Sequence, residues 1–214
     1  MPLQARAEAT RRRILDSAVD LFDELGYGET GLADVLQRAG VSKGAFYYHF
    51  DSKEAVASAI IEEYRRRNAE VVRERTDGSA PALDQLISAT FISAALIEED
   101  KSARIGNQLL QALSQISSGA SKIYAEWTAG FIKGATKGLE AVELGDGIDP
   151  AEIAEAIWVG VLGCHLLSSA LGDDPYSRLS RAWRAALYMI VPKDQAAHYF
   201  DLIDRSAAQY QKVG

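Results

Sequence analysis

The segment Ala39-Gly-Val-Ser-Lys-Gly-Ala-Phe-Tyr-Tyr-His-Phe50, followed by Asp51-Ser-Lys-Glu54, decides the fold of this chain. Gly40 can adopt the positive φ that commonly ends a helix. Ser42 can then cap the next helix by accepting a backbone N–H. The segment therefore predicts a turn, a short helix over about 43–49, and the start of a further helix.

The short helix has one face suited to a core and others suited to a partner. Phe46 and Phe50 are four residues apart, so they share a face and are expected to point inward. The remaining faces carry a cation, a methyl group, two phenols and an imidazole: Lys43, Ala45, Tyr47, Tyr48 and His49. Such an exposed face adds little to stability and suits a helix that enters the DNA major groove.

Helical periodicity dominates the rest of the chain, and strand-like alternation is nearly absent. The first two apolar stripes end at Gly26 and Gly40. Later stripes and breaks predict helices near 53–75, 81–98, 101–115, 120–144, 150–171, 175–191 and 193–211. We therefore expect an all-α fold of about nine or ten helices. A three-helix helix-turn-helix head over 1–55 precedes a larger helical body over 56–214, and the helix at about 53–75 connects them.

Composition limits the classes of function. The 214 residues carry a net charge of −7, so the chain lacks the basic footprint of a nonspecific nucleic-acid coat. Specific DNA binding needs only a local positive patch. The single cysteine, Cys164, excludes an internal disulfide and a cysteine-based zinc site, and we expect no metal or cofactor. It also favours a reducing, cytoplasmic location.

No segment of the sequence predicts export or membrane insertion. The N-terminus lacks the apolar core of a signal peptide. The longest apolar run, 157–171, is interrupted by polar residues and is shorter than the ~20 residues that span a bilayer. An enzyme is also not expected, because Cys164 and His165 are adjacent on a helix and their side chains diverge.

Over its first ~55 residues the chain resembles the TetR family of bacterial transcriptional repressors. The resemblance rests on three segments: 10–18, 21–30 and 39–54. Gly31 departs from the Ser or Thr that the family often has there, which predicts a weaker helix cap. The resemblance implies a homodimer with two DNA-binding heads and C-terminal domains that dimerise and bind a ligand.

Side-chain chemistry and this resemblance together predict the DNA contacts. They are assigned to Thr10, Arg11, Thr30, Ser42, Lys43, Gly44, Ala45, Tyr47, Tyr48, His49 and Lys53. Lys43 can reach a guanine edge or a phosphate, Ala45 a thymine methyl, and Lys53 a phosphate. Alternatives stay open for three of them: Tyr47 as core packing, His49 as a solvated side chain, and Arg11 as part of a solvated helix face. Arg6 is expected in a flexible arm near the minor groove.

A narrower resemblance lies in the body. The segments 89–91, 125–127 and 160–163 look like the γ-butyrolactone autoregulator receptors of actinomycetes. This resemblance implies that Trp127 lines a ligand pocket. Apolar walls are assigned to Phe91, Leu109, Leu113 and Phe131. The polar partner is Gln108, Gln111, Cys164 or Ser168. The alternative for Trp127 is a plain core stripe shared with Tyr124 and Phe131.

The expected partners are palindromic double-stranded DNA, a second copy of the chain and a small lipophilic effector. The alternative effector is a drug or metabolite unrelated to the lactones. Dimer contacts are expected from the helices near 150–171 and 175–191. Their candidate core or interface residues are Trp158, Val161, Leu162, Leu166, Trp183 and Leu187. Effector binding is expected to release the operator, and the operator-bound protein is expected on the nucleoid.

Overall fold

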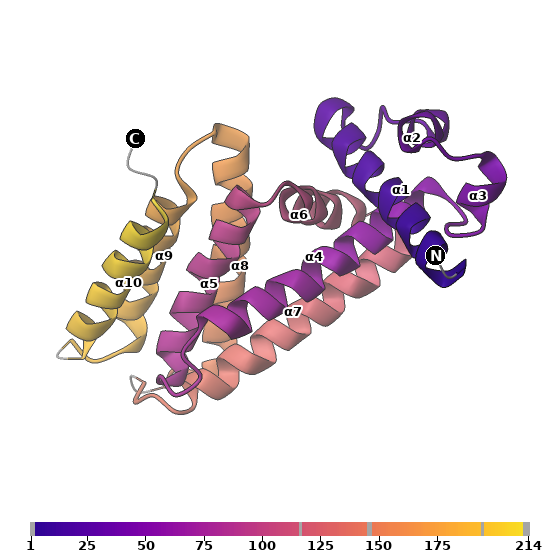
Figure 1. Cartoon of the computed structure of the whole chain (residues 1–214). Helices are drawn as coiled ribbons and strands as arrows, with labels where there is room; N and C mark the ends of the chain where they lie inside the picture. Colours follow the sequence, from indigo (N-terminus) through magenta and orange to yellow (C-terminus); the bar gives the residue numbers. More distant parts are fainter. Residues whose placement is uncertain (1–2, 116, 145–146, 194, 212–214) are drawn as a thin grey trace. The chain divides into compact units, whose positions relative to one another are not determined.

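The computed structural model describes residues 3–115, 117–144, 147–193 and 195–211, and these form ten α-helices (Figure 1). The first five are α1 (Leu3–Leu25), α2 (Leu32–Ala39), α3 (Lys43–Tyr47), α4 (Lys53–Arg75) and α5 (Ala82–Glu99). The next are α6 (Lys101–Leu113), α7 (Ser118–Leu139), α8 (Pro150–Leu171), α9 (Pro175–Ile190) and α10 (Ala196–Tyr210). The all-α prediction is confirmed. Part of the predicted break at 145–150 lies outside the described residues.

The chain divides into two compact units. The first unit comprises Met1–Ala69 and Ile97–Tyr124, and the second comprises Glu70–Leu96 and Ala125–Gly214. Both α4 and α7 therefore pass from one unit into the other. The division differs from the expected functional boundary at residue 55, because α6 and the first turns of α7 group with the N-terminal helices.

The first unit is built on α1, which packs against α2, α3 and α6 (Figure 1). The sequence predicts an apolar stripe from Ile14 to Leu25 on this helix, and most of it is buried. Ile14, Leu15, Ala18, Leu21 and Phe22 are all at most 5% exposed, whereas Leu25 at the end of the helix is 51% exposed. Gly26 ends the helix with φ 83°. Ion pairs from Lys101 to Asp20 and from Arg104 to Asp23 hold α6 beside α1.

A close helix approach joins α4 to α6 within this unit. A Cβ atom placed on Gly106 of α6 would overlap the Cβ of Tyr64 on α4 and lie 3.2 Å from the Ile60 carbonyl oxygen. Tyr64 itself is 3% exposed, and this burial raises the pKa of its phenol. Only glycine allows the two backbones to come this close.

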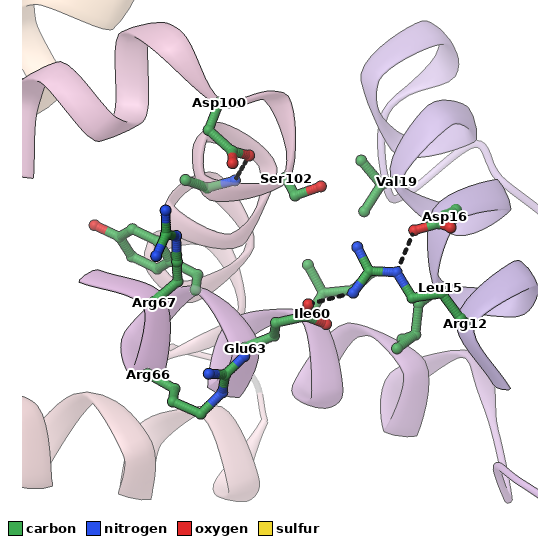
Figure 2. A pocket seen from close by; sticks show the side chains of 12 residues that line it. Arg12, Leu15, Asp16, Val19, Ile60, Glu63, Arg66, Arg67, Asp100 and Ser102 are labelled. Atoms are coloured by element: carbon green, nitrogen blue, oxygen red, sulfur yellow. Dashed lines mark hydrogen bonds and ion pairs between the residues drawn. The ribbon is translucent and has the colours of Figure 1, made fainter. Parts of the chain in front are cut away.

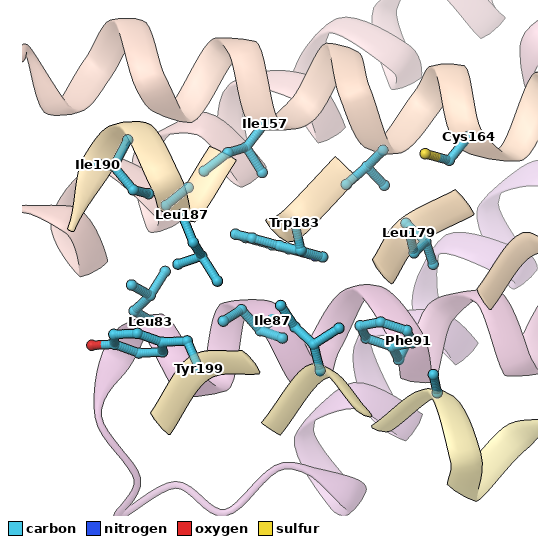
Figure 3. Close-up of a cluster of buried hydrophobic side chains, with 14 of the residues drawn as sticks. Leu83, Ile87, Phe91, Ile157, Cys164, Leu179, Trp183, Leu187, Ile190 and Tyr199 are labelled. Atoms are coloured by element: carbon cyan, nitrogen blue, oxygen red, sulfur yellow. The ribbon is translucent and has the colours of Figure 1, made fainter. Parts of the chain in front are cut away.

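The second unit has an apolar core shared by α5, α7, α8, α9 and α10. Figure 3 shows Trp183 of α9 among Ile87 and Phe91 of α5 and Leu187 of α9. The Trp183 indole N–H donates to Thr90 Oγ1 at 2.9 Å, so its polar atom is satisfied inside the core. Asp149 and Asp174 cap α8 and α9, because their carboxylates accept backbone N–H bonds at the starts of these helices.

Helix α8 is long and apolar enough to cross a membrane by length and composition alone. One of its faces instead supplies Ala154, Ile157, Val161 and Cys164 to the apolar core of the second unit. It is therefore a core helix that also carries exposed apolar residues on its other side.

Candidate DNA-binding surface and ligand-binding region

Helix α3 forms as its sequence predicts. Gly40 has φ 62°, and its N–H reaches back to the carbonyls of the last turn of α2. The Ser42 hydroxyl oxygen accepts the Ala45 N–H at 3.2 Å. On the inner side, Phe46 is fully buried and Phe50 is 6% exposed, with ring centroids 6.0 Å apart. These two aromatic side chains fix the orientation of the short helix.

The outer side of α3 presents the predicted polar and aromatic groups. Lys43 and Gly44 are exposed, Tyr47 is 46% exposed and Tyr48 is 76% exposed. Ala45 and His49 are half-buried, and the His49 ring packs edge-on against Tyr48 at 4.8 Å. We call Lys43, Tyr47, Tyr48 and the exposed backbone of Gly44 the recognition surface.

The packing of Tyr47 and His49 bears on the alternatives left open for these two residues. Tyr47 packs edge-on against Phe46, with ring centroids 5.5 Å apart, yet nearly half of it faces solvent. It is therefore not a plain core residue. His49 is half-buried beside Tyr48, so it is not a freely solvated side chain.

Thr30 is placed differently from its prediction. The side chain is 1% exposed, and its hydroxyl donates to the carbonyl oxygens of Gly26 at 2.8 Å and Leu21 at 3.3 Å. This burial contradicts a DNA contact by the Thr30 side chain. Its role is to close the loop between α1 and α2. Gly31 begins α2, and its N–H donates to Asp34 at 2.8 Å, so an acidic side chain compensates for the missing cap hydroxyl.

Lys53 also has a structural setting that the sequence did not reveal. Its ammonium donates to the carbonyl oxygens of Tyr27 at 2.8 Å and Thr30 at 2.7 Å. It also lies 4.3 Å from the centre of the Tyr27 ring. Ser52 precedes Lys53 and caps α4 by accepting the Ala55 N–H at 3.0 Å. The contact between Lys53 and a phosphate stays a prediction.

The N-terminal end of α1 carries the remaining predicted DNA contacts. Thr10 is half-buried and donates to the Arg6 carbonyl at 3.0 Å. The Arg11 guanidinium lies 5.3 Å from the centre of the Phe50 ring. Arg6 lies inside α1, which begins at Leu3, so the expectation of a flexible arm at this residue is wrong. Helical periodicity simply continues further toward the N-terminus than the basic cluster suggested.

A cavity of about 200 Å³, lined by both charged and apolar side chains, lies beside α1 in the first unit (Figure 2). The Arg12 guanidinium crosses it, pairing with Asp16 at 2.9 Å and Glu63 at 2.5 Å. The hydrogen bond that Arg12 donates to Glu63 raises the pKa of Arg12. Asp100 on its rim caps α6 by accepting the Ala103 N–H at 3.0 Å. The pair with Glu63 ties α1 to α4 and engages the Arg12 guanidinium within the first unit.

The second unit holds an aromatic cluster around Trp127. Trp127 of α7 is half-buried and packs edge-on against Trp158 of α8, with ring centroids 5.3 Å apart. The ring centroids of Phe131 and Trp158 are 4.5 Å apart. The Trp158 indole N–H donates to Thr128 Oγ1 at 3.1 Å. Trp158 and Thr128 were not predicted as ligand residues, and contacts between helices distant in sequence are what place them here.

The six predicted ligand residues divide between the units. Leu109 and Leu113 are buried on α6 in the first unit. The other four belong to the second unit, where Phe91 and Cys164 lie in the core and Phe131 packs against it. Whether these six residues line one pocket stays a prediction.

A second cavity, of about 190 Å³, lies between α8 and α9. Its lining is apolar and includes Ile157, Val161, Trp183 and the exposed Met189. Trp127 lines neither this cavity nor the one beside α1.

Helices α8 and α9 expose an apolar surface that we call the apolar face. It consists of Val159, Leu166, Leu167, Leu171, Tyr188 and Met189, each at least 47% exposed. Of the candidate core or interface residues, Leu166 alone is among these; Trp158, Val161, Trp183 and Leu187 are buried and Leu162 is half-buried. Val159, Leu167 and Leu171 were missed because apolar residues occur on several sides of α8, so periodicity does not say which side is left open. Tyr188 and Met189 of α9 were missed as well.

The structure offers little for covalent or metal chemistry. Burial raises the pKa of the Cys164 thiol, and burial lowers the pKa of the neighbouring His165 to about 4. Neither shift activates a nucleophile or a general base at neutral pH. Within the described part of the chain, no group of three His, Cys, Asp or Glu side chains is placed to hold a metal ion.

Known proteins are similar to this chain over both of its halves. The family model of bacterial regulatory proteins, tetR family, matches residues 14–60. The A-factor receptor protein of Streptomyces griseus is 32% identical over 200 residues, which cover 92% of this chain and 70% of that protein.

Solved structures extend the similarity to the body. One of a gamma-butyrolactone receptor (ArpA-like protein) has a TM-score of 0.74 at 27% identity, covering 95% of this chain and 99% of the other. CprB from Streptomyces coelicolor, in complex with its biological operator sequence, has a TM-score of 0.68 at 28% identity, with the same coverage. These similarities therefore span nearly the whole chain, including both units.

Proposed function

Since this chain belongs to the TetR family of bacterial regulators, we propose that it is a ligand-responsive repressor that binds a palindromic operator as a homodimer. A small lipophilic effector of the γ-butyrolactone class releases the repressor from its operator. The family consists of DNA-binding regulators rather than enzymes. The protein acts in the cytoplasm, and on its operator it lies on the nucleoid.

The observation that carries the DNA-binding function is the recognition surface on α3. Two buried aromatic rings, Phe46 and Phe50, orient this helix, so its exposed side chains are free for a partner. In the major groove, Lys43 donates to guanine or to a phosphate, and Ala45 contacts a thymine methyl. Tyr47, Tyr48, His49 and Ser42 contact the backbone or neighbouring bases.

Dimerisation is supported by the apolar face of α8 and α9. Its six large apolar side chains would be covered by the same face of a second copy, because a two-fold interface is self-complementary. A dimer would present two copies of α3, which suits half-sites about 34 Å apart in successive turns of the DNA major groove.

The effector class is supported by the aromatic cluster in the second unit. Trp127 is half-buried, so its indole can offer both apolar contact and an N–H to a ligand carbonyl. Phe131 and Trp158 supply further apolar surface. The names of the A-factor receptor and the gamma-butyrolactone receptor support a lactone over an unrelated drug or metabolite.

Release follows from a two-state equilibrium. One state holds the two α3 helices at the spacing of the operator half-sites, and the effector binds a second state more tightly. Only this difference in affinity shifts the population between the states. The layout supports such coupling, since α4 and α7 each run continuously from the first unit into the second.

Binding to the DNA upstream of the chain's own gene tests this function. Wild-type protein should bind specifically, with an affinity that falls steeply as salt rises. Lys43→Ala should weaken binding, whereas Lys193→Ala should not, because Lys193 is an exposed lysine on the second unit. Equal affinities for wild type and Lys43→Ala would rule out the recognition surface.

A further inference from the structure

Lys53 connects the first residue of α4 to the loop between α1 and α2. Its ammonium donates to two backbone carbonyls of that loop, those of Tyr27 and Thr30, at 2.8 and 2.7 Å. The same ammonium lies 4.3 Å from the centre of the Tyr27 ring. One side chain therefore makes three contacts to a single loop that is more than twenty residues away in sequence.

This arrangement explains a cation in an unfavourable position. A lysine in the first turn of a helix opposes the helix dipole, which favours anions there. Two carbonyl oxygens and an aromatic face offset that cost, because hydrogen bonds from a charged donor are stronger than those between neutral groups. Lys53 is half-buried, so little water competes for its ammonium.

The loop itself is held from its other side by Thr30. The Thr30 hydroxyl donates to Gly26 and Leu21, so the loop is fastened to the end of α1. Lys53 fastens the same loop to α4. The loop leads directly into α2, and α2 leads through Gly40 into α3. The position of the recognition surface therefore depends on where this loop is held.

We propose that Lys53 is a positioning residue for DNA binding: it fixes the α1–α2 loop, and through it α2 and α3, instead of binding a phosphate. The proposal rests on the DNA-binding function above. Two of the three N–H groups of its ammonium are engaged within the protein. A phosphate contact through these donors would have to break the bonds that hold the loop.

The two roles differ in how binding responds to salt. A lysine that contacts a phosphate contributes about 0.9 to the slope of log affinity against log salt, or about 1.8 for a dimer. A positioning lysine lowers the affinity without changing this slope. We expect Lys53→Met to lower operator affinity about tenfold or more, as expected from losing charge-assisted hydrogen bonds, with the slope of wild type.

Lys43→Met is the matched comparison, because Lys43 is exposed on the recognition surface. If Lys43 binds a phosphate, Lys43→Met shows the reduced slope. If Lys43 reads a base, the slope of Lys43→Met equals that of wild type, and the test then depends on Lys53→Met alone. A slope for Lys53→Met that is smaller than that of wild type by about 1.8 would overturn the positioning role. So would an affinity equal to that of wild type. Loss of specific binding by wild type itself would instead overturn the proposed function.

A neutral replacement provides a rescue test. The Lys53→Gln amide still has two N–H donors for the loop carbonyls but carries no charge for a phosphate. It should recover part of the affinity that Lys53→Met loses. Equal losses in the two variants would contradict the proposal.

A measurement on wild type covers the case in which the variants do not fold. Proton exchange of the Lys53 ammonium is followed by nitrogen-detected NMR in the protein without DNA. Protection from exchange is expected, because the donors are bonded to Tyr27 and Thr30. Fast exchange that slows only when operator DNA is added would assign the ammonium to a phosphate and overturn the proposal.

Discussion

At the scale of single residues, Phe46 and Tyr48 separate folding from recognition within one short helix. Phe46 is completely buried and Tyr48 is 76% exposed, although they are only two residues apart. Phe46→Ala should lower the free energy of unfolding by about 3–5 kcal/mol, because it leaves a cavity in the first unit. Urea denaturation followed by circular dichroism measures this loss.

Tyr48→Ala should leave the free energy of unfolding within about 0.5 kcal/mol of wild type, since the side chain is on the surface. Its operator affinity should nevertheless fall about tenfold if the ring contacts DNA. Fluorescence anisotropy with a labelled duplex gives the affinity. A Tyr48→Ala protein that is as destabilised as Phe46→Ala would show that the two side chains share a structural role.

The sequence predicted well which side chains of α3 are exposed, but it did not predict the contacts of Thr30 and Lys53. The spacing of Phe46 and Phe50 determines which side of α3 is buried, so Lys43, Tyr47 and Tyr48 were placed correctly. The hydrogen bonds of Thr30 and Lys53 were not predicted, because they go to backbone carbonyls. No side-chain pattern in the sequence marks a free carbonyl as an acceptor.

At the scale of helices, the bounds of α4 and α8 agree with the predicted 53–75 and 150–171. Caps explain this agreement: Ser52 begins α4, and Asp149 with Pro150 begins α8. The predicted end of α7 was less accurate, since the helix stops at Leu139 rather than near 144. Apolar residues continue past that point, as Val142 and Leu144, and they pack against the core without being helical.

The crossing of α4 and α6 gives a prediction at this scale. Gly106→Ala should destabilise the protein by roughly 1–3 kcal/mol, because the added methyl overlaps Tyr64 and the helices must separate. Gly134→Ala is the matched control in α7, where an added Cβ meets nothing within 4 Å. It should stabilise the protein by about 0.5–1 kcal/mol through helix propensity alone.

Thermal and urea denaturation of the two glycine variants measure the change in the free energy of unfolding, which should have opposite signs in the two variants. If Gly106→Ala is as stable as wild type, the close approach of α4 and α6 is not required for the fold. Because both helices belong to the first unit, the same variant should also weaken operator binding. That effect is measured separately at a temperature where the variant remains folded.

At the scale of the whole molecule, the division into units was beyond the sequence. Turns and periodicity predicted a head over 1–55, yet α6 groups with the N-terminal helices. Its attachment depends on Gly106 and on ion pairs from Lys101 and Arg104 to α1, across about eighty residues of chain. Contacts over such separations leave no local pattern.

The apolar face predicts the oligomeric state of the molecule. Leu166→Asp should convert a dimer into a monomer, because it puts a charge among apolar side chains that a second copy would bury. Leu25→Asp is the matched control, since Leu25 is a 51% exposed leucine of the first unit. Sedimentation equilibrium measures both masses. A dimeric Leu166→Asp protein would place the dimer contact elsewhere.

The central claim is that one molecule both binds an operator and releases it to a lactone. The most direct measurement is fluorescence anisotropy of the labelled upstream duplex with wild-type protein, titrated with an acyl γ-butyrolactone. We predict specific binding that the lactone weakens roughly 5- to 150-fold, and a smaller response in Trp127→Ala. Specific binding that the lactone leaves unchanged would contradict the effector class, and affinity equal to that for an unrelated duplex would contradict operator recognition.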